Sequence, residues 1–172
     1  MMPDSCRRIV IGIGNRDRGD DAAGCSVVKL LQDTLPPDIE LAEHDGDLSA
    51  LISRLDGVAA AFLVDACASG TPPGTVHRFN VAAAPLPQAI FGVSTHGLGL
   101  AAAVELARAI GGLPPQCIVY AIEGSSFEMG APLSPAVAAA AKDVAVRLRA
   151  ELAGKSAPRR EDQCTKPDSW PT

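Results

Sequence analysis

Residues 9–24 read Ile-Val-Ile-Gly-Ile-Gly-Asn-Arg-Asp-Arg-Gly-Asp-Asp-Ala-Ala-Gly. An apolar, β-branched run stops at two glycines and an asparagine, a charged loop follows, and Asp20 and Asp21 open a predicted helix. A strand, a tight turn and a helix start in this order form the first unit of a parallel α/β sheet. Such sheets bind their ligands at the carboxyl ends of the strands, which is where this loop lies.

The remaining hydrophobic pattern extends this unit into an alternation of strands and helices. The first strand is expected over residues 7–14, and its nearly continuous apolar centre is typical of a strand covered on both faces. Further strands are expected over residues 38–44, 58–66, 75–81 (at the sheet edge, with His77 and Arg78) and 117–123. Helices are expected from residue 20 to Pro36, over 48–55, from His96 to residue 110, and from Pro135 to residue 152 with Ser134 as its cap.

Composition limits the class of protein. The 172 residues are enough for one domain with a proper core, expected over residues 1–153. Hydrophobic residues make up 47% but aromatic ones only 3%, so the core must be aliphatic. A net charge of -5 without a basic stripe argues against nucleic acid as a partner. From Gly154 onward there is no apolar periodicity, and residues 154–172 are expected to be a disordered tail.

Cysteine use and the N-terminal sequence indicate a cytoplasmic protein. None of the five cysteines forms a C-x-x-C pair, and four lie in or beside apolar segments, so a reduced compartment is the simpler interpretation. The chain enters its first strand with no room for a signal peptide. No apolar run approaches the ~20 residues of a membrane span, so no membrane contact is expected.

Asp21, Asp65 and His96 stand where predicted strands end or predicted helices begin. These places converge on one edge of a parallel sheet. Two carboxylates and an imidazole suit a divalent cation of borderline softness such as zinc or nickel. We expect no cysteine to take part, because strand alternation is taken to leave Cys67 without a shared face with His96.

Each of the three residues also has an ordinary structural explanation. Asp20 or Asp21 can cap a helix and meet the positive end of its dipole. His96 can be a plain surface histidine. Asp65 follows an apolar run, and a carboxylate at that depth needs a partner. The prediction of a site therefore depends on all three residues occurring at positions that converge on one edge of the sheet.

Other glycine-loop chemistries do not fit the sequence. Asp17 stands where the dinucleotide fingerprint G-x-G-x-x-G needs its third glycine. No G-x-S-x-G elbow and no phosphate-binding G-x-x-x-x-G-K-[ST] loop occurs. The predicted site is therefore neither a dinucleotide site nor a serine-hydrolase elbow.

Four blocks, in register, resemble the hydrogenase maturation proteases over about residues 8–152. They are Gly12-Ile13-Gly14-Asn15 with Arg18-Gly19-Asp20-Asp21 and Gly24; Phe62-Leu63-Val64-Asp65-Ala66; Ser94-Thr95-His96-Gly97-Leu98-Gly99-Leu100; and Ile122-Glu123-Gly124-Ser125-Ser126-Phe127 with Gly130 and Leu133-Ser134-Pro135. The resemblance implies a three-layer α/β sandwich in which a twisted, mostly parallel five-stranded sheet lies between helices.

The resemblance also implies a function. Members of the family are endopeptidases that remove the C-terminal extension from the nickel-loaded large-subunit precursor of a NiFe hydrogenase. Their metal-contacting and catalytic acid, acid and histidine match Asp21, Asp65 and His96. Many members have Glu at the first position. The Asp-Gly-Gly turn of relatives appears as Asp45-Gly46-Asp47, so substrate contact is carried over to Asp45 and Gly46 alone.

Two questions about the chemistry stay open at this stage. A protein-bound divalent metal, expected to be nickel and replaceable by zinc or cadmium in a crystal, can activate water as a Lewis acid. Alternatively, the trio binds the nickel of the substrate as a checkpoint, and one aspartate acts as general base. The competing function is a non-catalytic, metal-sensing chaperone of the hydrogenase subunit. We expect a monomer that binds this precursor.

Overall fold

The computed structural model describes residues 7–91 and 95–154, with the backbone alone for residues 95–98. The tail expected over residues 154–172 lies outside this description except for Gly154, the C-cap residue of the last helix. The elements in chain order are β1 (Arg8–Ile13), the 3-10 helix η1 (Gly19–Ala22), α1 (Ala23–Leu31), β2 (Ile39–His44), α2 (Leu48–Leu55), β3 (Ala60–Cys67), β4 (Val76–Asn80), α3 (Gln88–Phe91), α4 (Thr95–Ala109), β5 (Gln116–Glu123) and α5 (Pro135–Ala153).

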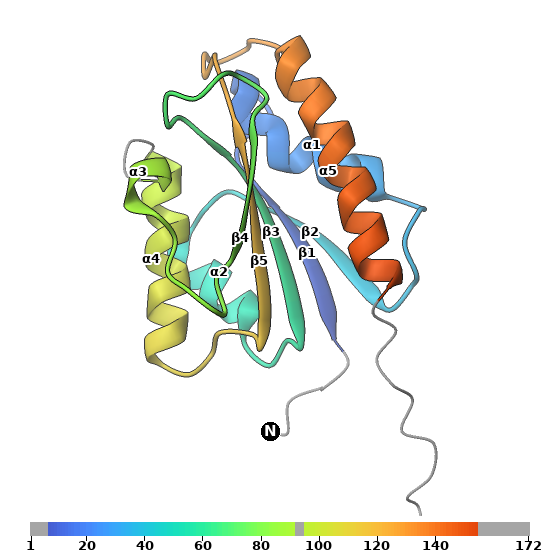
Figure 1. The fold of residues 1–172 in the computed structure, drawn as a ribbon, viewed down its shortest axis with the longest axis vertical. Helices are drawn as coiled ribbons and strands as arrows, with labels where there is room; N and C mark the ends of the chain where they lie inside the picture. Colours follow the sequence, from blue (N-terminus) through green and yellow to red (C-terminus); the bar gives the residue numbers. More distant parts are fainter. Residues whose placement is uncertain (1–6, 92–94, 155–172) are drawn as a thin grey trace, which may run out of the picture.

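The five strands form one sheet in the order β2-β1-β3-β5-β4. All neighbours are parallel except β4, which runs antiparallel to β5 at the edge. In Figure 1 the parallel strands rise together, so that their carboxyl ends meet at the upper edge. The predicted fold class, a mostly parallel five-stranded sheet between helices, is confirmed.

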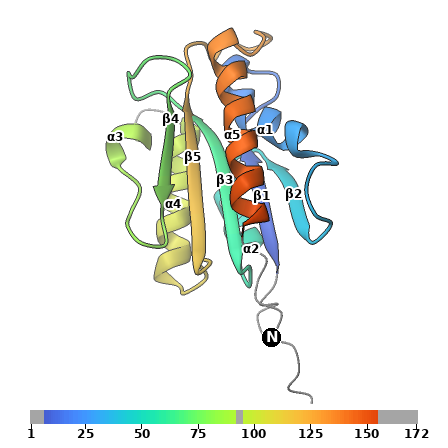
Figure 2. The same cartoon turned by 45° about the vertical axis from the view of Figure 1, so that its right-hand side comes forward.

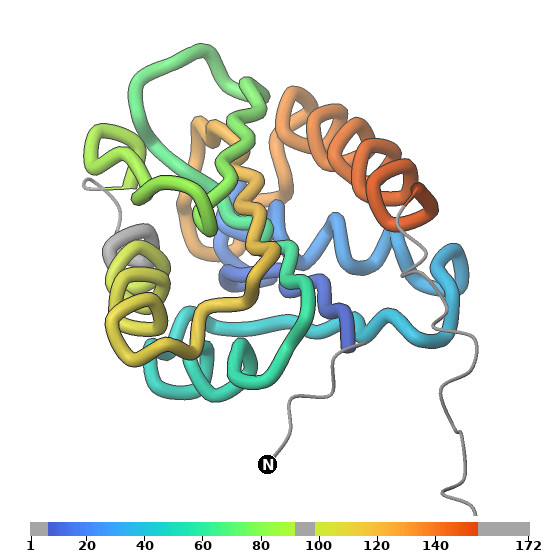
Figure 3. Tube along the Cα trace, turned by 60° about the horizontal axis from the view of Figure 1, so that its bottom comes forward, coloured from blue at the N-terminus to red at the C-terminus, as the bar shows by residue number. Residues whose placement is uncertain are grey.

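Helices cover both faces of this sheet. α1 and α5 pack on one face, and α2, α3 and α4 pack on the other. Figure 2 shows α5 in front of the strands and α4 behind them, and the end-on view in Figure 3 separates the same two helical layers. Each face has its own core, which is mainly aliphatic but includes Phe91 on one face and Phe62 and Tyr120 on the other. None of the described helices is long and apolar enough to cross a bilayer.

Two glycines let the first helix approach the sheet closely. A Cβ on Gly12 would lie 2.2 Å from the carbonyl oxygen of Gly24, and a Cβ on Gly24 would lie 2.4 Å from that of Val64. Real Cβ atoms do not come this near, so both positions exclude any larger residue. Because α1 sits directly on β1 and β3, the turn before it is fixed at the carboxyl ends of these strands.

The structure departs from the expected elements in three places. The first helix begins as the 3-10 turn η1 and ends at Leu31, five residues before Pro36. The proline-rich loop contains the short helix α3, whose Phe91 packs edge-on against Phe79 of β4. Ser134 does occupy the N-cap of α5, but its hydroxyl is not used to cap the helix.

Candidate functional site

Asp21 is held at the start of the first helix by the turn that follows β1. The residue is buried, with 4% of its surface exposed. The backbone N–H of Asn15 donates to its Oδ2 at 3.0 Å. The turn is tight, because a Cβ on Gly14 would lie 1.9 Å from the carbonyl oxygen of Asp21. The Gly14-Asn15 pair therefore fixes the position of this carboxylate.

Asp65 lies near the carboxyl end of β3 and is fully buried. Its Oδ1 accepts a hydrogen bond from the N–H of Ala66 at 2.8 Å, whereas its Oδ2 has no hydrogen-bond partner in the described part of the chain. Burial and the nearby charge of Asp21 raise the pKa of Asp65 to about 8. The two predicted carboxylates thus come together, and one of their oxygens is unsatisfied.

An unsatisfied buried carboxylate oxygen costs free energy unless something binds it. A divalent cation between Asp21 and Asp65 would neutralise both charges, and carboxylate oxygens are suitable ligands for borderline and harder cations. The unpartnered Oδ2 of Asp65 is therefore suited to bind a metal ion. A proton supplies the same compensation when no cation is bound, which is why the pKa rises.

His96 lies in the first turn of α4, and its side chain is outside the described residues. The backbone one turn further on is described. A Cβ on Gly99 would lie 3.2 Å from the carbonyl oxygen of Gly46, which follows β2. The start of α4 therefore lies beside the loop at the carboxyl end of β2, on the same edge of the sheet as the two aspartates.

A cleft of about 390 Å³ opens at this edge. It is lined by Gly14, Arg16, Cys25, Glu43, His44 and Asp45. His44 accepts a hydrogen bond at Nδ1 from the N–H of Gly46, at 2.9 Å, which places Asp45 on the cleft wall. The side chain of Asp47 accepts from the N–H of Ala50 and caps α2. The carboxylate of Asp47 is therefore engaged in capping the helix N-terminus.

Asp20 is also fully buried, but both of its carboxylate oxygens accept hydrogen bonds. Five donors reach its two oxygens: the backbone N–H groups of Ser125, Ser126 and Ser134, and the hydroxyls of Ser125 and Ser134. Burial would raise the pKa of Asp20, but these hydrogen bonds outweigh it and hold the pKa below its usual value. Asp20 thus ties the segment before α5 to η1, a role that the helix-capping interpretation missed.

A second cluster of metal-ligating side chains lies on β3, the strand of Asp65, and on the next two strands, β5 and β4. Ligand atoms of Cys67, His77 and Glu123 all lie within 4.8 Å of one another. The His96 side chain lies outside the described residues, so the expectation that Cys67 shares no face with it stays a prediction. Cys67 and Asp65 are two residues apart on β3 and so face the same side of the sheet. That side is the one that α4 covers. Sequence alone missed His77 and Glu123, since their proximity depends on the pairing of β4 with β5.

The sequence profile of the hydrogenase maturation protease family matches residues 25–151. No curated protein matches the sequence. Among solved structures, the hydrogenase maturating endopeptidase HybD from Escherichia coli is 25% identical with a TM-score of 0.73, over 86% of this chain and 93% of that one. The NiFe hydrogenase maturation protease HycI from Thermococcus kodakarensis shares the fold, at 24% identity and a TM-score of 0.65 over 86% and 93% of the chains.

The fold and the site define a three-layer α/β sandwich with two carboxylates at the carboxyl edge of its sheet. The profile match assigns that fold to a family. This chain belongs to the hydrogenase maturation protease family, as its four sequence blocks predicted. Asp65 and His96 lie inside the matched residues, and Asp21 lies four residues before them.

Proposed function

We propose that this protein is an endopeptidase that removes the C-terminal extension of a nickel-loaded large-subunit precursor of a NiFe hydrogenase. The observation that carries the proposal is the buried Oδ2 of Asp65, which has no partner in the described chain although Asp21 lies close by. Membership of the family supports the reaction class.

The nickel is cargo that the substrate brings to the enzyme. Carboxylate oxygens of Asp21 and Asp65 and an imidazole nitrogen of His96 form the set that contacts it. Two carboxylates and one neutral imidazole balance a 2+ charge, and a three-ligand set leaves a position for ligands held by the precursor. A precursor without nickel would leave the two carboxylates facing each other with no cation between them.

Contact with the nickel positions the extension for cleavage. The cleft lined by Gly14 and Asp45 is the proposed path of the extended peptide, with Gly46 next to Asp45 in the chain. Water attacks the scissile carbonyl carbon, and one of the two carboxylates takes the water proton as general base. The C–N bond then breaks as the amide nitrogen receives a proton, which restores the base.

The test uses purified precursor in nickel-loaded and nickel-free forms, with the shortened subunit detected by mass. Wild type should cleave only the loaded form. His96→Ala and Asp21→Asn should abolish cleavage, because an amide is a weak ligand and a much weaker base than a carboxylate. Asp17→Asn is the matched control: Asp17 is an exposed carboxylate of the same loop, and its change should leave cleavage intact.

Two outcomes would contradict the proposal. Equal cleavage of both precursors would refute the requirement for nickel in the precursor and favour a metal ion held by the protein itself. Tight binding of the precursor without cleavage by folded wild type would identify a metal-sensing chaperone instead.

A further inference from the structure

We propose that Cys67, His77 and Glu123 form a second divalent-cation site, of the zinc class, separate from the Asp21–Asp65–His96 set. The three side chains come from three adjacent strands of the sheet. Cys67 ends β3, Glu123 ends β5, and His77 lies on the antiparallel edge strand β4. Thiolate, imidazole and carboxylate are the ligand types that zinc takes in proteins.

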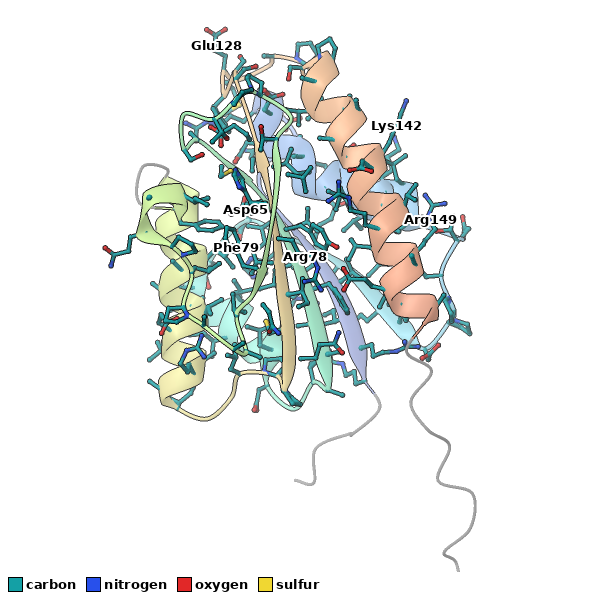
Figure 4. The ribbon with its side chains drawn as sticks, in the orientation of Figure 1. Asp65, Arg78, Phe79, Glu128, Lys142 and Arg149 are labelled. Carbon is teal, nitrogen blue, oxygen red and sulfur yellow. The ribbon has the colours of Figure 1, made fainter. Side chains whose placement is uncertain are left out.

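Sheet register brings these side chains to one face. Cys67 is the direct neighbour of Glu123, and His77 is the direct neighbour of Ala121, two residues earlier on β5. Residues two apart on a strand point the same way, so all three ligands share one side. Figure 4 shows the alternation on β4, where Phe79 points towards α4 and Arg78 towards α5; His77 alternates with Arg78 and shares the side of Phe79.

The Glu123 carboxylate is already oriented for a metal ion. Its Oε1 accepts two main-chain bonds, from the N–H groups of Ser69 and Gly70, each at 2.8 Å. Its Oε2 accepts only from side chains, the Ser69 hydroxyl at 2.8 Å and the Cys67 thiol at 3.2 Å. The two main-chain hydrogen bonds therefore hold the orientation of the carboxylate, as hydrogen bonds to metal-ligating carboxylates commonly do. The side-chain donors can rotate away and leave Oε2 available to an ion.

The other two ligands need little rearrangement. The Cys67 sulfur already points at Oε2, so an ion between them would replace the thiol proton, which leaves for solvent as the metal–sulfur bond forms. His77 presents Nε2 to the Thr71 hydroxyl at 3.3 Å, and its ring is stacked on Phe79 with 13° between the planes. An ion on Nε2 displaces one weak hydrogen bond and keeps the stacked ring orientation.

Glu123 alone is explained by the loop that it holds, because four hydrogen bonds satisfy a carboxylate. One of those bonds comes from the Cys67 thiol, but none of them explains why the His77 imidazole also lies within 4.8 Å of the thiol and the carboxylate. Three protein ligands leave one position of a tetrahedral ion for water. Bound there, the ion would join β3, β5 and β4 at the carboxyl edge. Asp65, Ala121 and His77 form one cross-strand row in which Ala121 separates the other two, so the two cation sites are neighbours with separate ligands.

Cobalt(II) is the probe, because a thiolate ligand gives it a near-ultraviolet charge-transfer band that oxygen and nitrogen ligands do not give. The full chain carries Cys6→Ser and Cys164→Ser, so that thiols outside the described residues contribute nothing. Titration should produce one band-forming cobalt per chain, and zinc should abolish the band because zinc binds such ligands more tightly than cobalt. Cys67→Ser should lose the band, and His77→Gln should weaken its cobalt affinity at least ten-fold.

Two control variants separate this site from its neighbours. Asp21→Asn should keep the full band, which makes the result independent of the proposed protease function. Cys25→Ser should also keep it, although Cys25 lies in the cleft with Glu43 and His44. A folded wild type without the band, a band that survives Cys67→Ser, or one that disappears with Cys25→Ser would overturn the proposal. If Cys67→Ser does not fold, the affinity of His77→Gln decides the question: cobalt binding equal to wild type would refute the site.

Discussion

Asp20 and Asp65 are both fully buried carboxylates near the same edge of the sheet, yet their surroundings are opposite. Asp20 accepts five hydrogen bonds, which lower its pKa. Asp65 accepts one, leaves Oδ2 unpartnered within the described residues, and has its pKa raised to about 8. The difference teaches that burial of an acid does not by itself mark function. What marks Asp65 is a buried oxygen, Oδ2, that no described group donates to, since a purely structural carboxylate would be expected to have donors for both oxygens.

The largest effect should follow removal of the satisfied carboxylate. Asp20→Ala removes the buried acceptor of three backbone N–H groups and two hydroxyls, which belong to partly exposed serines. Because a hydrogen bond to a charged group contributes about 1.5–3 kcal/mol and water can replace part of the lost acceptor, the free energy of unfolding should fall by about 4 kcal/mol. Urea denaturation measures it. Asp17→Ala, an exposed acid three residues earlier, should change stability by less than about 0.5 kcal/mol. Similar losses in both variants would show that the hydrogen-bonded network around Asp20 is not what stabilises this segment.

An intermediate effect of opposite sign is expected at Asp65. In metal-free protein its carboxyl stays protonated up to about pH 8, whereas in the unfolded chain it ionises near its ordinary value of 3.8. The folded state therefore binds more protons between these limits, and stability falls as pH rises from about 4 to about 8. Asp65→Asn removes that dependence. At pH 8 the metal-free variant should be more stable than wild type, by about 2 kcal/mol if relaxation absorbs part of the burial cost.

The matching measurement is urea denaturation of both proteins at several pH values in the presence of a chelator. Parallel curves for wild type and Asp65→Asn, or a variant that is less stable at every pH, would show that Asp65 is satisfied in a way that resembles Asp20.

The smallest effect should come from removing one donor to Asp20. Ser134→Ala deletes a hydroxyl that donates to Oδ2 at 3.0 Å, but four other donors remain. The expected loss is about 1.5 kcal/mol, the lower end for a hydrogen bond to a charged group, because the other donors still satisfy the carboxylate. Thermal unfolding of this variant beside Asp20→Ala compares the two. A loss as large as that of Asp20→Ala would place the stability in the Ser134 hydroxyl and not in the carboxylate.

Much of the fold could be predicted because hydrophobic period and turn residues act locally. Helix α2 has the expected bounds, and the five strands lie within two residues of the expected ones at each end. The 3-10 turn before α1 could not be predicted, because it follows from the close approach of Gly24 to β3. Helix α3 was missed because its four residues are too few to show a helical period.

The candidate site was partly predictable for a physical reason. Asp21 and Asp65 were found because parallel strands end at one edge, and this rule needs no knowledge of strand order. The distinction between Asp20 and Asp21 needed the loop at residues 124–134, which reaches Asp20 from more than 100 positions away. His77 and Glu123 needed the antiparallel register of β4 on β5, which no local pattern contains.

The most direct test of the account is cleavage of nickel-loaded precursor by Asp65→Asn, measured by mass beside wild type, with thermal unfolding of both proteins in the same buffer. A nearly isosteric amide keeps the shape of the buried side chain but is a poor metal ligand and a poor base. The account predicts a rate at least about 100-fold below wild type, the usual cost of losing a general base, in a protein that unfolds at the same or a higher temperature. Cleavage at the wild-type rate by the folded variant would contradict it, because the unpartnered oxygen of Asp65 would then have no part in the reaction.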